Sequence, residues 1–529
     1  MTPGFGTGTH PRKGAKMQRI QVIINLVAVL GTATPVAAQS GFKFFEPVIP
    51  PRAVQIMAHR GLTTVAPENS AEAVLVCAAD FIEWAEVDVR LTKDARHVIL
   101  HDDRLERTTD GNGPVAEITR DDFIKLDAGS WDAPRFRGIH PLTLEQLLKL
   151  AKGKVNLYLD CKQINPELLA REILESRMES QVIVYDRPAN LARVRAASGN
   201  KIATMTKFRP QSMQFELCVR EVDPAAIEID ADDATAELCR RFHDRGIKVQ
   251  AKVLGANWDN AATWTKMIEA GVDWLQTDDP AGVRFTEVRH RLKTVPVKIA
   301  HHRGTNRYAP ENTLPAIRTA VALGADYIEI DIHTTRDGQF VLMHDRTLSR
   351  TTGQQGNVAE MSAEELSRLD AGAWFGRQFA GTRVPTLHEA LEMTAGKSGL
   401  YLDAKDIAPK SLLAAMQKHQ LIDNSVVYQS PEYLAKLRAL EPRVRTLPPL
   451  RSAAEIESVA QEKPFGVDAR WSALSRELIS RCHVVGIQVF SDALGPNENV
   501  EQYSRAIEWG IDVIQTDYPL RVLRAIELH

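Results

Sequence analysis

The sequence MAHRGLTTVAPENS at residues 57–70 occurs again at residues 300–313 as AHHRGTNRYAPENT. His59 then corresponds to His302, an offset of 302 − 59 = 243 residues. Further matches at this offset are Glu86-Val87-Asp88 with Glu329-Ile330-Asp331, His101-Asp102 with His344-Asp345, and Leu157-Tyr158-Leu159-Asp160 with Leu400-Tyr401-Leu402-Asp403. Solenoid repeats are only about 20–50 residues long. The chain of 529 residues therefore contains a duplicated whole domain, with expected limits of 52–290 and 297–529.

Each half of the chain alternates short β-rich runs with longer helix-like runs, which predicts βαβ units and a parallel sheet. In the first half the candidate strands are residues 54–58, 83–89, 98–100, 155–159, 182–185, 202–205, 226–229, 248–253 and 274–276. The second and third of these lie too close together for a crossover helix, so they form a hairpin. Eight parallel strands then remain, and the fold expected for each half is a (β/α)₈ TIM barrel, with a doubly wound open sheet as the alternative.

The hairpin places acids and histidines near one another. In the second half it contains Asp337-Gly338, a favoured two-residue hairpin turn. A turn centred between these residues sets His344 opposite Asp331. By the same register His101 lies opposite Asp88. We therefore expect an acid pair and a histidine to meet at the mouth of each barrel.

Composition excludes some classes of function. The chain has 65 Lys and Arg against 68 Asp and Glu, a formal net charge of −3, which argues against a general nucleic-acid binder. Charged residues make up 25% and hydrophobic residues 44% of the chain, as in ordinary globular proteins.

Residues 1–38 read as an N-terminal extension followed by a secretory signal. Arg19 supplies positive charge, residues 20–30 are mostly apolar, and residues 36–38 form a small-residue cleavage site. A bilayer span needs about 20 apolar residues, so we expect an exported protein, periplasmic or extracellular, with no membrane span in the mature chain.

Five cysteines occur, and none forms a Cys-x-x-Cys pair or a zinc pattern. An odd number in an exported protein requires at least one free thiol or an intermolecular bond. The sequence allows a disulfide between Cys218 and Cys239, but the fold does not rest on a disulfide framework.

Charged side chains gather at the ends of two predicted strands. Glu86 and Asp88 are two residues apart on one strand, so both point the same way, and Asp160 and Lys162 do so on another. Three close carboxylates repel one another, and a hard divalent cation, Ca²⁺ or Mg²⁺, would relieve this repulsion. The alternative is a salt-bridge network of these acids with Lys162 and Arg60. The second half repeats the set as Glu329, Asp331, Asp403, Lys405 and Arg303.

The charge of this group points to an anionic substrate. Three carboxylates, a divalent cation, Arg60 and Lys162 together carry about one positive charge, which suits a phosphodiester. His59 and His101 are the candidate general base and general acid, because imidazole titrates near neutral pH. Their counterparts in the second half are His302 and His344.

The two Pro-Glu-Asn segments precede predicted helices. Asn69, Ser70, Asn312 and Thr313 are all residue types that cap helices. Alternatively, Glu68 and Glu311 order the histidines or the metal ligands.

Together these motifs resemble those of the glycerophosphodiester phosphodiesterase family. They are H-R-G, P-E-N-[ST], E-x-D-[VI]-x-x-T-x-D, H-D-x-x-L-x-R-T-T, L-D-A-G-x-W and T-D-x-P, in order through nearly all of both halves. The resemblance implies TIM barrels of the phospholipase C-like phosphodiesterase type, a divalent metal, commonly Ca²⁺ or Mg²⁺, and a small-molecule phosphodiester substrate. It implies hydrolysis of glycerophosphodiesters to an alcohol and glycerol 3-phosphate.

The resemblance also implies roles for individual residues. The catalytic histidines are His59, His101, His302 and His344. The metal ligands are Glu86, Asp88, Asp160, Glu329, Asp331 and Asp403. The phosphate-binding cations are Arg60, Lys162, Arg303 and Lys405.

The sequence departs from the family at the metal ligands and at the rim that selects the substrate. Family members often have Glu at the positions of Asp160 and Asp403, and the shorter side chain keeps the charge but would shift the ion or favour a different one. A Trp-x-Val-Asn-like run on the seventh strand is replaced by residues 249–252, VQAK, and 489–492, VFSD. Two other hypotheses therefore stay open: one barrel is a non-catalytic binding module, or the substrate is another phosphodiester, such as a phospholipid, a polyol-phosphate polymer or a sugar phosphodiester.

Overall fold

The structure, a computed structural model, describes residue 39, residues 41–292 and residues 294–529. The expected signal at residues 17–38 lies outside these residues. Among the helices of the described residues, none combines the length and the apolar character that a membrane crossing requires.

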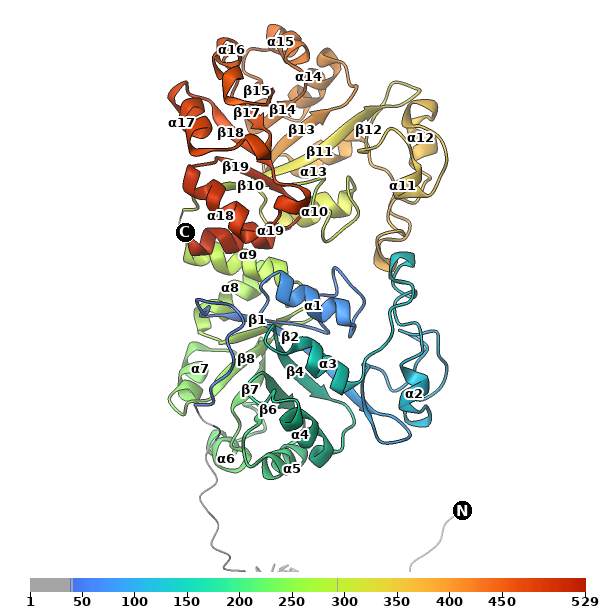
Figure 1. Cartoon of the computed structure of the whole chain (residues 1–529), viewed down its shortest axis with the longest axis vertical. Coiled ribbons are helices and arrows are strands. Elements are labelled where there is room, and N and C mark those ends of the chain that lie inside the picture. Colours follow the sequence, from blue (N-terminus) through green and yellow to red (C-terminus); the bar gives the residue numbers. More distant parts are fainter. Residues whose placement is uncertain (1–38, 40, 293) are drawn as a thin grey trace, which may run out of the picture. The chain divides into compact units, whose positions relative to one another are not determined.

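The first half forms a closed barrel of eight parallel strands with one antiparallel strand added (Figure 1). The sheet order is β1-β9-β8-β7-β6-β5-β4-β2-β3, and pairing of β1 with β2 closes the barrel. The strands are β1 Gln55–Ala58, β2 Trp84–Leu91, β3 His97–Ile99, β4 Asn156–Cys161, β5 Val182–Tyr185, β6 Ala203–Lys207, β7 Ala226–Asp230, β8 Lys248–Lys252 and β9 Trp274–Thr277. The barrel is confirmed, and the nine predicted strands agree with these bounds within two residues.

The second half repeats the barrel with one interrupted strand. Its order is β15-β14-β13-β11-β10-β19-β18-β17-β16, with β12 paired to β11. Only Pro448 separates β15 from β16, so the two are pieces of one strand that completes the ring of eight. The strands are β10 Lys298–His301, β11 Tyr327–Thr334, β12 Phe340–Leu342, β13 Gly399–Ala404, β14 Ser425–Tyr428, β15 Arg445–Leu447, β16 Pro449–Leu450, β17 Gly466–Ala469, β18 Gln488–Asp492 and β19 Val513–Thr516.

Helices surround each barrel and return the chain to the start of the next strand (Figure 1). Polar caps set where they begin: Thr143 and Thr386 each form a capping box with the third helical residue. In the first barrel the helices are α1 Ala71–Ala79, α2 Arg120–Phe123, α3 Leu144–Ala151, α4 Pro166–Glu175, α5 Pro188–Ser198, α6 Phe215–Leu217, α7 Ala236–His243, α8 Ala261–Ala270 and α9 Pro280–Arg291. In the second they are α10 Leu314–Ala322, α11 Ser349–Thr352, α12 Ala363–Leu366, α13 Leu387–Thr394, α14 Pro409–Lys418, α15 Pro431–Leu440, α16 Ile456–Gln461, α17 Arg476–Val484, α18 Val500–Trp509 and α19 Pro519–Leu528.

The predicted register of the hairpin is wrong by one residue. The antiparallel pair Ile332–Leu342 continues to Asp331 opposite Met343, whose backbone N–H donates to the Asp331 carbonyl at 3.1 Å. In the first barrel Val89–Ile99 continues in the same way to Asp88 opposite Leu100. The reason is the turn: Thr335 pairs with Gln339 across three loop residues, and Gly338 takes a left-handed φ of +73°. The loop is thus the three-residue type with glycine in the left-handed position, not the two-residue type.

The five cysteines are all free thiols. Cys218 and Cys239 are both buried and unbridged, so the disulfide that the sequence allows between them does not form. Burial raises the pKa of both thiols to about 11, which keeps them protonated and unreactive.

His301 is a buried histidine that should make the fold sensitive to acid. It is 1% exposed, its ring lies 5.8 Å from that of Phe285, and burial lowers its pKa to about 3. Unfolded histidine binds a proton near pH 6.5, so stability present above that pH is lost as the pH falls toward 3. The expected loss is about 1.4 kcal/mol for each pH unit in this window.

The test compares the wild type with His301→Ala, which introduces the residue found at the equivalent position 58. Urea unfolding at pH 7 and pH 5 should show a smaller loss of unfolding free energy for the variant. Equal losses in both proteins would contradict the prediction.

Candidate active site

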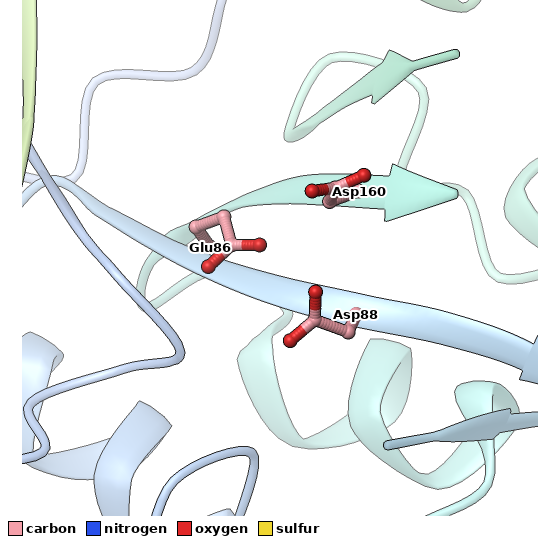
Figure 2. A group of neighbouring side chains, drawn as sticks. All are labelled: Glu86, Asp88 and Asp160. Carbon is pink, nitrogen blue, oxygen red and sulfur yellow. The ribbon is translucent and has the colours of Figure 1, made fainter. Parts of the chain in front are cut away.

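Three carboxylates converge at the mouth of the first barrel. Glu86 and Asp88 lie on β2, and Asp160 lies beside them on the neighbouring strand β4, with Asp88 and Asp160 in direct register (Figure 2). One oxygen from each carboxylate lies within 4.8 Å of the others. Parallel strands end at this mouth, so two short sequence motifs are brought to one point.

Cations compensate only part of this negative charge. Lys162 Nζ lies 3.1 Å from Asp88 Oδ1 and 2.7 Å from Asp160 Oδ2, and Arg60 Nε lies 3.6 Å from Asp88 Oδ2. Glu86 Oε2 accepts a 2.7 Å hydrogen bond from the backbone N–H of Arg60. Glu86 Oε1 is buried and has no hydrogen-bond partner. The salt-bridge network expected as an alternative therefore exists, but it leaves this oxygen unsatisfied.

The pKa values of the acids reflect their burial and their mutual repulsion. Burial raises the pKa of Glu86 well above its ordinary range, and the charges of Asp88 and Asp160 raise it further. Burial also raises the pKa of Asp160, although the adjacent Lys162 opposes this. A buried oxygen without a partner, among carboxylates that repel one another, fits the all-oxygen coordination that Ca²⁺ and Mg²⁺ take. Glu86, Asp88 and Asp160 are the residues that would hold such an ion.

The loop after β1 directs a backbone donor at Glu86. Arg60 has a φ of +57°, a conformation that residues other than glycine adopt at a cost and that often marks functional sites. Gly61 follows at φ +82°, and a Cβ there would lie 2.7 Å from the Cβ of Ala73 in α1. The His-Arg-Gly motif thus combines a histidine, a strained donor and a close backbone contact with a helix.

The Pro-Glu-Asn-Ser segment supplies a helix cap and a contact that holds Asp88. Ser70 caps α1 by accepting a hydrogen bond from the Ala73 N–H, which confirms the helix-capping prediction for Ser70. Asn69 is not the cap: its side chain donates to Asp88 Oδ2 at 2.8 Å and accepts from the Asp88 N–H at 3.0 Å. Asn69 therefore fixes Asp88, a candidate metal ligand, in place. The sequence does not show that these two residues are close.

Each histidine of the first barrel is held by an aspartate. His59 Nδ1 lies 2.7 Å from Asp278 Oδ1, and His59 Nε2 lies 4.0 Å from Glu86 Oε2. His101 Nδ1 lies 2.7 Å from Asp102 Oδ1. A carboxylate on Nδ1 fixes the tautomer and leaves Nε2 for proton transfer. The role of Asp278 is not among the sequence predictions, although its Gln-Thr-Asp motif is repeated at the end of the second half.

Arg107 connects the second histidine to the Pro-Glu-Asn loop. It donates to both oxygens of Glu68 at 2.8 Å, and its Nε donates to Asp102 Oδ2 at 2.6 Å. This hydrogen bond holds the pKa of Asp102 well below its ordinary range, so Asp102 stays ionised beside His101. Glu68 is therefore linked to His101 through Arg107 and Asp102, in line with the alternative prediction for this residue. In the sequence, Arg107 is marked by the H-D-x-x-L-x-R-T-T motif and by its repeat 243 residues later, at Arg350, but neither shows its partners.

The second barrel repeats the carboxylate cluster, its cations and the two histidine–aspartate pairs. Glu329, Asp331 and Asp403 form an equivalent cluster within 4.8 Å. Burial acts to raise the pKa of Asp331, but the positive charges of Lys405 and Arg303 and the neighbouring His344 outweigh burial, and the pKa lies below its ordinary value. The equivalent contacts are Lys405 with Asp331 at 2.9 Å, Arg303 N–H with Glu329 at 2.7 Å, Asn312 with Asp331 at 2.7 Å, His302 with Asp517 at 2.6 Å and His344 with Asp345 at 2.8 Å. All the predicted site residues thus gather at the two barrel mouths.

Comparisons with known proteins match both barrels separately. The family model described as "Glycerophosphoryl diester phosphodiesterase family" matches residues 59–282 and 302–521. The glycerophosphodiester phosphodiesterase of Bacillus subtilis (strain 168) is 31% identical over 244 residues, 41% of this chain and 82% of that protein. The enzyme of that name from Caldanaerobacter subterraneus subsp. tengcongensis is 31% identical over 42% of this chain and 96% of its own length. The solved glycerophosphodiester phosphodiesterase of Agrobacterium tumefaciens is 29% identical with a TM-score of 0.39, covering 43% of this chain and 99% of its own.

Proposed function

Because the chain belongs to the glycerophosphoryl diester phosphodiesterase family, we propose that each of its two barrels hydrolyses glycerophosphodiesters to an alcohol and glycerol 3-phosphate. One observation carries the proposal. Three carboxylates stand beside two histidines that are each held by an aspartate, and this arrangement occurs at the mouth of both barrels.

The carboxylate cluster is proposed to hold one divalent cation, Ca²⁺ or Mg²⁺. When bound, such an ion polarises the phosphoryl oxygen and offsets the charge that develops there. Lys162 keeps its positive charge: burial lowers its pKa, but Asp88 and Asp160 raise it more strongly. Lys162 and Arg60 are therefore available to bind the anionic phosphoryl group. Lys405 and Arg303 would act in the same way in the second barrel.

The two histidines are proposed to transfer the protons. Attack of an oxygen nucleophile on phosphorus breaks the bond to the leaving alcohol, so one proton leaves the nucleophile and one reaches the departing oxygen. His59 and His101 can serve as base and acid because Asp278 and Asp102 each fix Nδ1. In the second barrel His302 and His344 take these roles.

The direct test is release of glycerol 3-phosphate from glycerophosphocholine by the purified chain with added Ca²⁺ or Mg²⁺. The expected result is metal-dependent release of glycerol 3-phosphate and choline in equal amounts. Appearance of a cyclic phosphate without glycerol 3-phosphate would instead favour attack by a substrate hydroxyl and a different phosphodiester. No turnover by either barrel would refute the proposal.

A further inference from the structure

A buried aspartate of the first barrel is paired with two arginines of the second. Asp80 follows the last residue of α1, and its side chain is 1% exposed. Asp80 Oδ2 lies 2.8 Å from Arg307 Nη2, and Asp80 Oδ1 lies 3.3 Å from Arg521 Nε. Both barrels belong to one compact unit, Ala38–His529. A buried carboxylate requires a compensating charge, and here both compensating charges come from the other barrel.

Arg307 lies beside the histidine–aspartate pair of the second barrel. It follows Asn306, whose side-chain amide donates to Asp517 Oδ1 and lies 3.3 Å from His302 Nδ1. Asp517 in turn holds His302, with 2.6 Å between Oδ1 and Nδ1. The guanidinium group of Arg307 also lies 4.3 Å from the centre of the Tyr518 ring. Arg307 is therefore one peptide bond away from a residue that contacts both members of the pair.

Arg521 reaches the same pair by a second route. Its guanidinium group lies 3.8 Å from the centre of the ring of Tyr518, the residue that follows Asp517. Arg521 Nη1 also donates to the backbone carbonyl of Glu498 at 2.9 Å. The side chain of Glu498 accepts a hydrogen bond of 2.6 Å from the backbone N–H of Asp517. Arg521 thus supports Asp517 through Tyr518 and through Glu498.

Loss of the charge on Asp80 would leave two cations side by side. Burial lowers the pKa of Arg307, but the charge of Asp80 outweighs burial, and the pKa lies above its ordinary value. Arg307 and Arg521 contact the same carboxylate and the same aromatic ring, and like charges so placed repel each other when no anion compensates them. The repulsion would displace the segments next to the histidine–aspartate pair. Misplacement of a reacting group by about 1 Å can lower a rate by about 10²-fold.

Neither barrel offers this support in the opposite direction. Leu323 stands in the second barrel where Asp80 stands in the first, 243 residues earlier. Thr64 and Gly282 stand in the first barrel where Arg307 and Arg521 stand in the second. The carboxylate and both guanidinium groups are therefore absent from the equivalent places, and the arrangement is not a product of the duplication.

The two histidine–aspartate pairs also differ in exposure. The side chains of His59 and Asp278 are 18% and 51% exposed, whereas those of His302 and Asp517 are 9% and 32% exposed. The first pair is supported from within its own barrel, because the backbone N–H of Asp278 donates to Asp259 Oδ2 at 2.7 Å. The pair that the other barrel supports is the more enclosed of the two.

We propose that Asp80 of the first barrel is a positioning residue for the His302–Asp517 pair of the second barrel. The second barrel then reaches its full rate only while the first barrel presents this carboxylate, whereas the first barrel needs no equivalent support. This inference rests on the proposed phosphodiesterase activity, and it makes the dependence between the barrels run in one direction.

The experiment measures each barrel separately in the full chain, with glycerophosphocholine and added Ca²⁺ or Mg²⁺. His59→Ala leaves the second barrel active, and His302→Ala leaves the first. In the His59→Ala chain, Asp80→Asn should lower kcat by ~10-fold or more and change KM by less than ~2-fold, because misplacement affects proton transfer more than binding. In the His302→Ala chain the same change should leave kcat and KM unaltered. A general loss of structure would instead harm the first barrel, to which Asp80 belongs, at least as much as the second.

Further variants guard against misfolding of Asp80→Asn. Asp80→Glu keeps the charge and should restore most of the lost kcat. Arg307→Gln breaks the same contact from the other side, so it should lower the kcat of the second barrel similarly and add little to the effect of Asp80→Asn. The matched control is Glu527→Gln at another buried contact between the barrels, where Glu527 pairs with Arg52 and Arg291. It should leave the kcat of both barrels unchanged.

The possible failures separate the two proposals. An equal loss of kcat in both barrels, a loss in the first barrel alone, or no loss in the second would overturn the positioning role of Asp80 and leave the phosphodiesterase activity standing. Activity in the His302→Ala chain without activity in the His59→Ala chain would show that the second barrel is not catalytic, which also overturns this role. Absence of hydrolysis in both chains overturns the proposed function and the positioning role with it.

Discussion

Replacing His59 and His302 together by alanine is expected to abolish phosphodiesterase activity, with a loss of at least ~10³-fold in kcat. The reason is that each histidine is one of the two candidate proton-transfer groups at the mouth of its barrel, and each is held by one aspartate. His59 Nδ1 lies 2.7 Å from Asp278 and His302 Nδ1 lies 2.6 Å from Asp517. Without the imidazole, neither the nucleophile nor the leaving oxygen has its proton-transfer partner in that barrel.

Each single variant should keep the activity of the other barrel. His59→Ala should retain the share due to the second barrel, and His302→Ala the share due to the first, so the two residual activities should add up to that of the wild type. His290→Ala, an exposed histidine on α9, is the matched control and should retain full activity. Full activity in the double variant would show that the site is wrongly assigned. Loss of all activity in one single variant would mean that the other barrel is a non-catalytic module.

Removal of divalent ions is expected to lower activity by more than ~100-fold in both barrels, and addition of Ca²⁺ or Mg²⁺ should restore it. The physical basis is Glu86 Oε1, which is buried without a hydrogen-bond partner among carboxylates whose charges Lys162 only partly offsets. An ion that binds the folded chain and not the unfolded chain also stabilises it, by about 2.7 kcal/mol at 100 times its Kd. The Tm should therefore rise with added ion.

The double variant Glu86→Gln plus Glu329→Gln separates binding from catalysis. It keeps the side-chain shape but removes one negative charge from each cluster, so the ion should no longer raise the Tm at the same concentration. The matched control is Glu145→Gln plus Glu392→Gln, which removes two exposed charges from α3 and α13. A Tm that does not respond to any divalent ion in the wild type would contradict the metal assignment.

The acid and histidine positions could be predicted because they depend on local rules. Glu86 and Asp88 share a face since residues alternate along a strand, and a parallel barrel brings strand ends to one mouth. The repeat at 243 residues then distinguished candidate site residues from chance occurrences of the same residue types, because unrelated surface positions do not recur in order.

Contacts between distant residues could not be predicted. His59 and Asp278 are 219 residues apart, and only closure of the barrel between β9 and β1 brings them together. Arg107 and Glu68 meet because two loops lie side by side at the mouth. The hairpin register failed for a smaller reason: the conformation of Gly338 added one residue to the loop.

The sequence by itself determined the two tandem barrels, the residues at their mouths and the class of chemistry, since periodicity, duplication and motif order are all written along the chain. Only the tertiary structure decided that Asn69 holds Asp88, that one oxygen of Glu86 has no partner, and that Asp80 of the first barrel contacts two arginines of the second. The physical reason is that these properties depend on distances and burial across separate elements, which no single stretch of the chain contains.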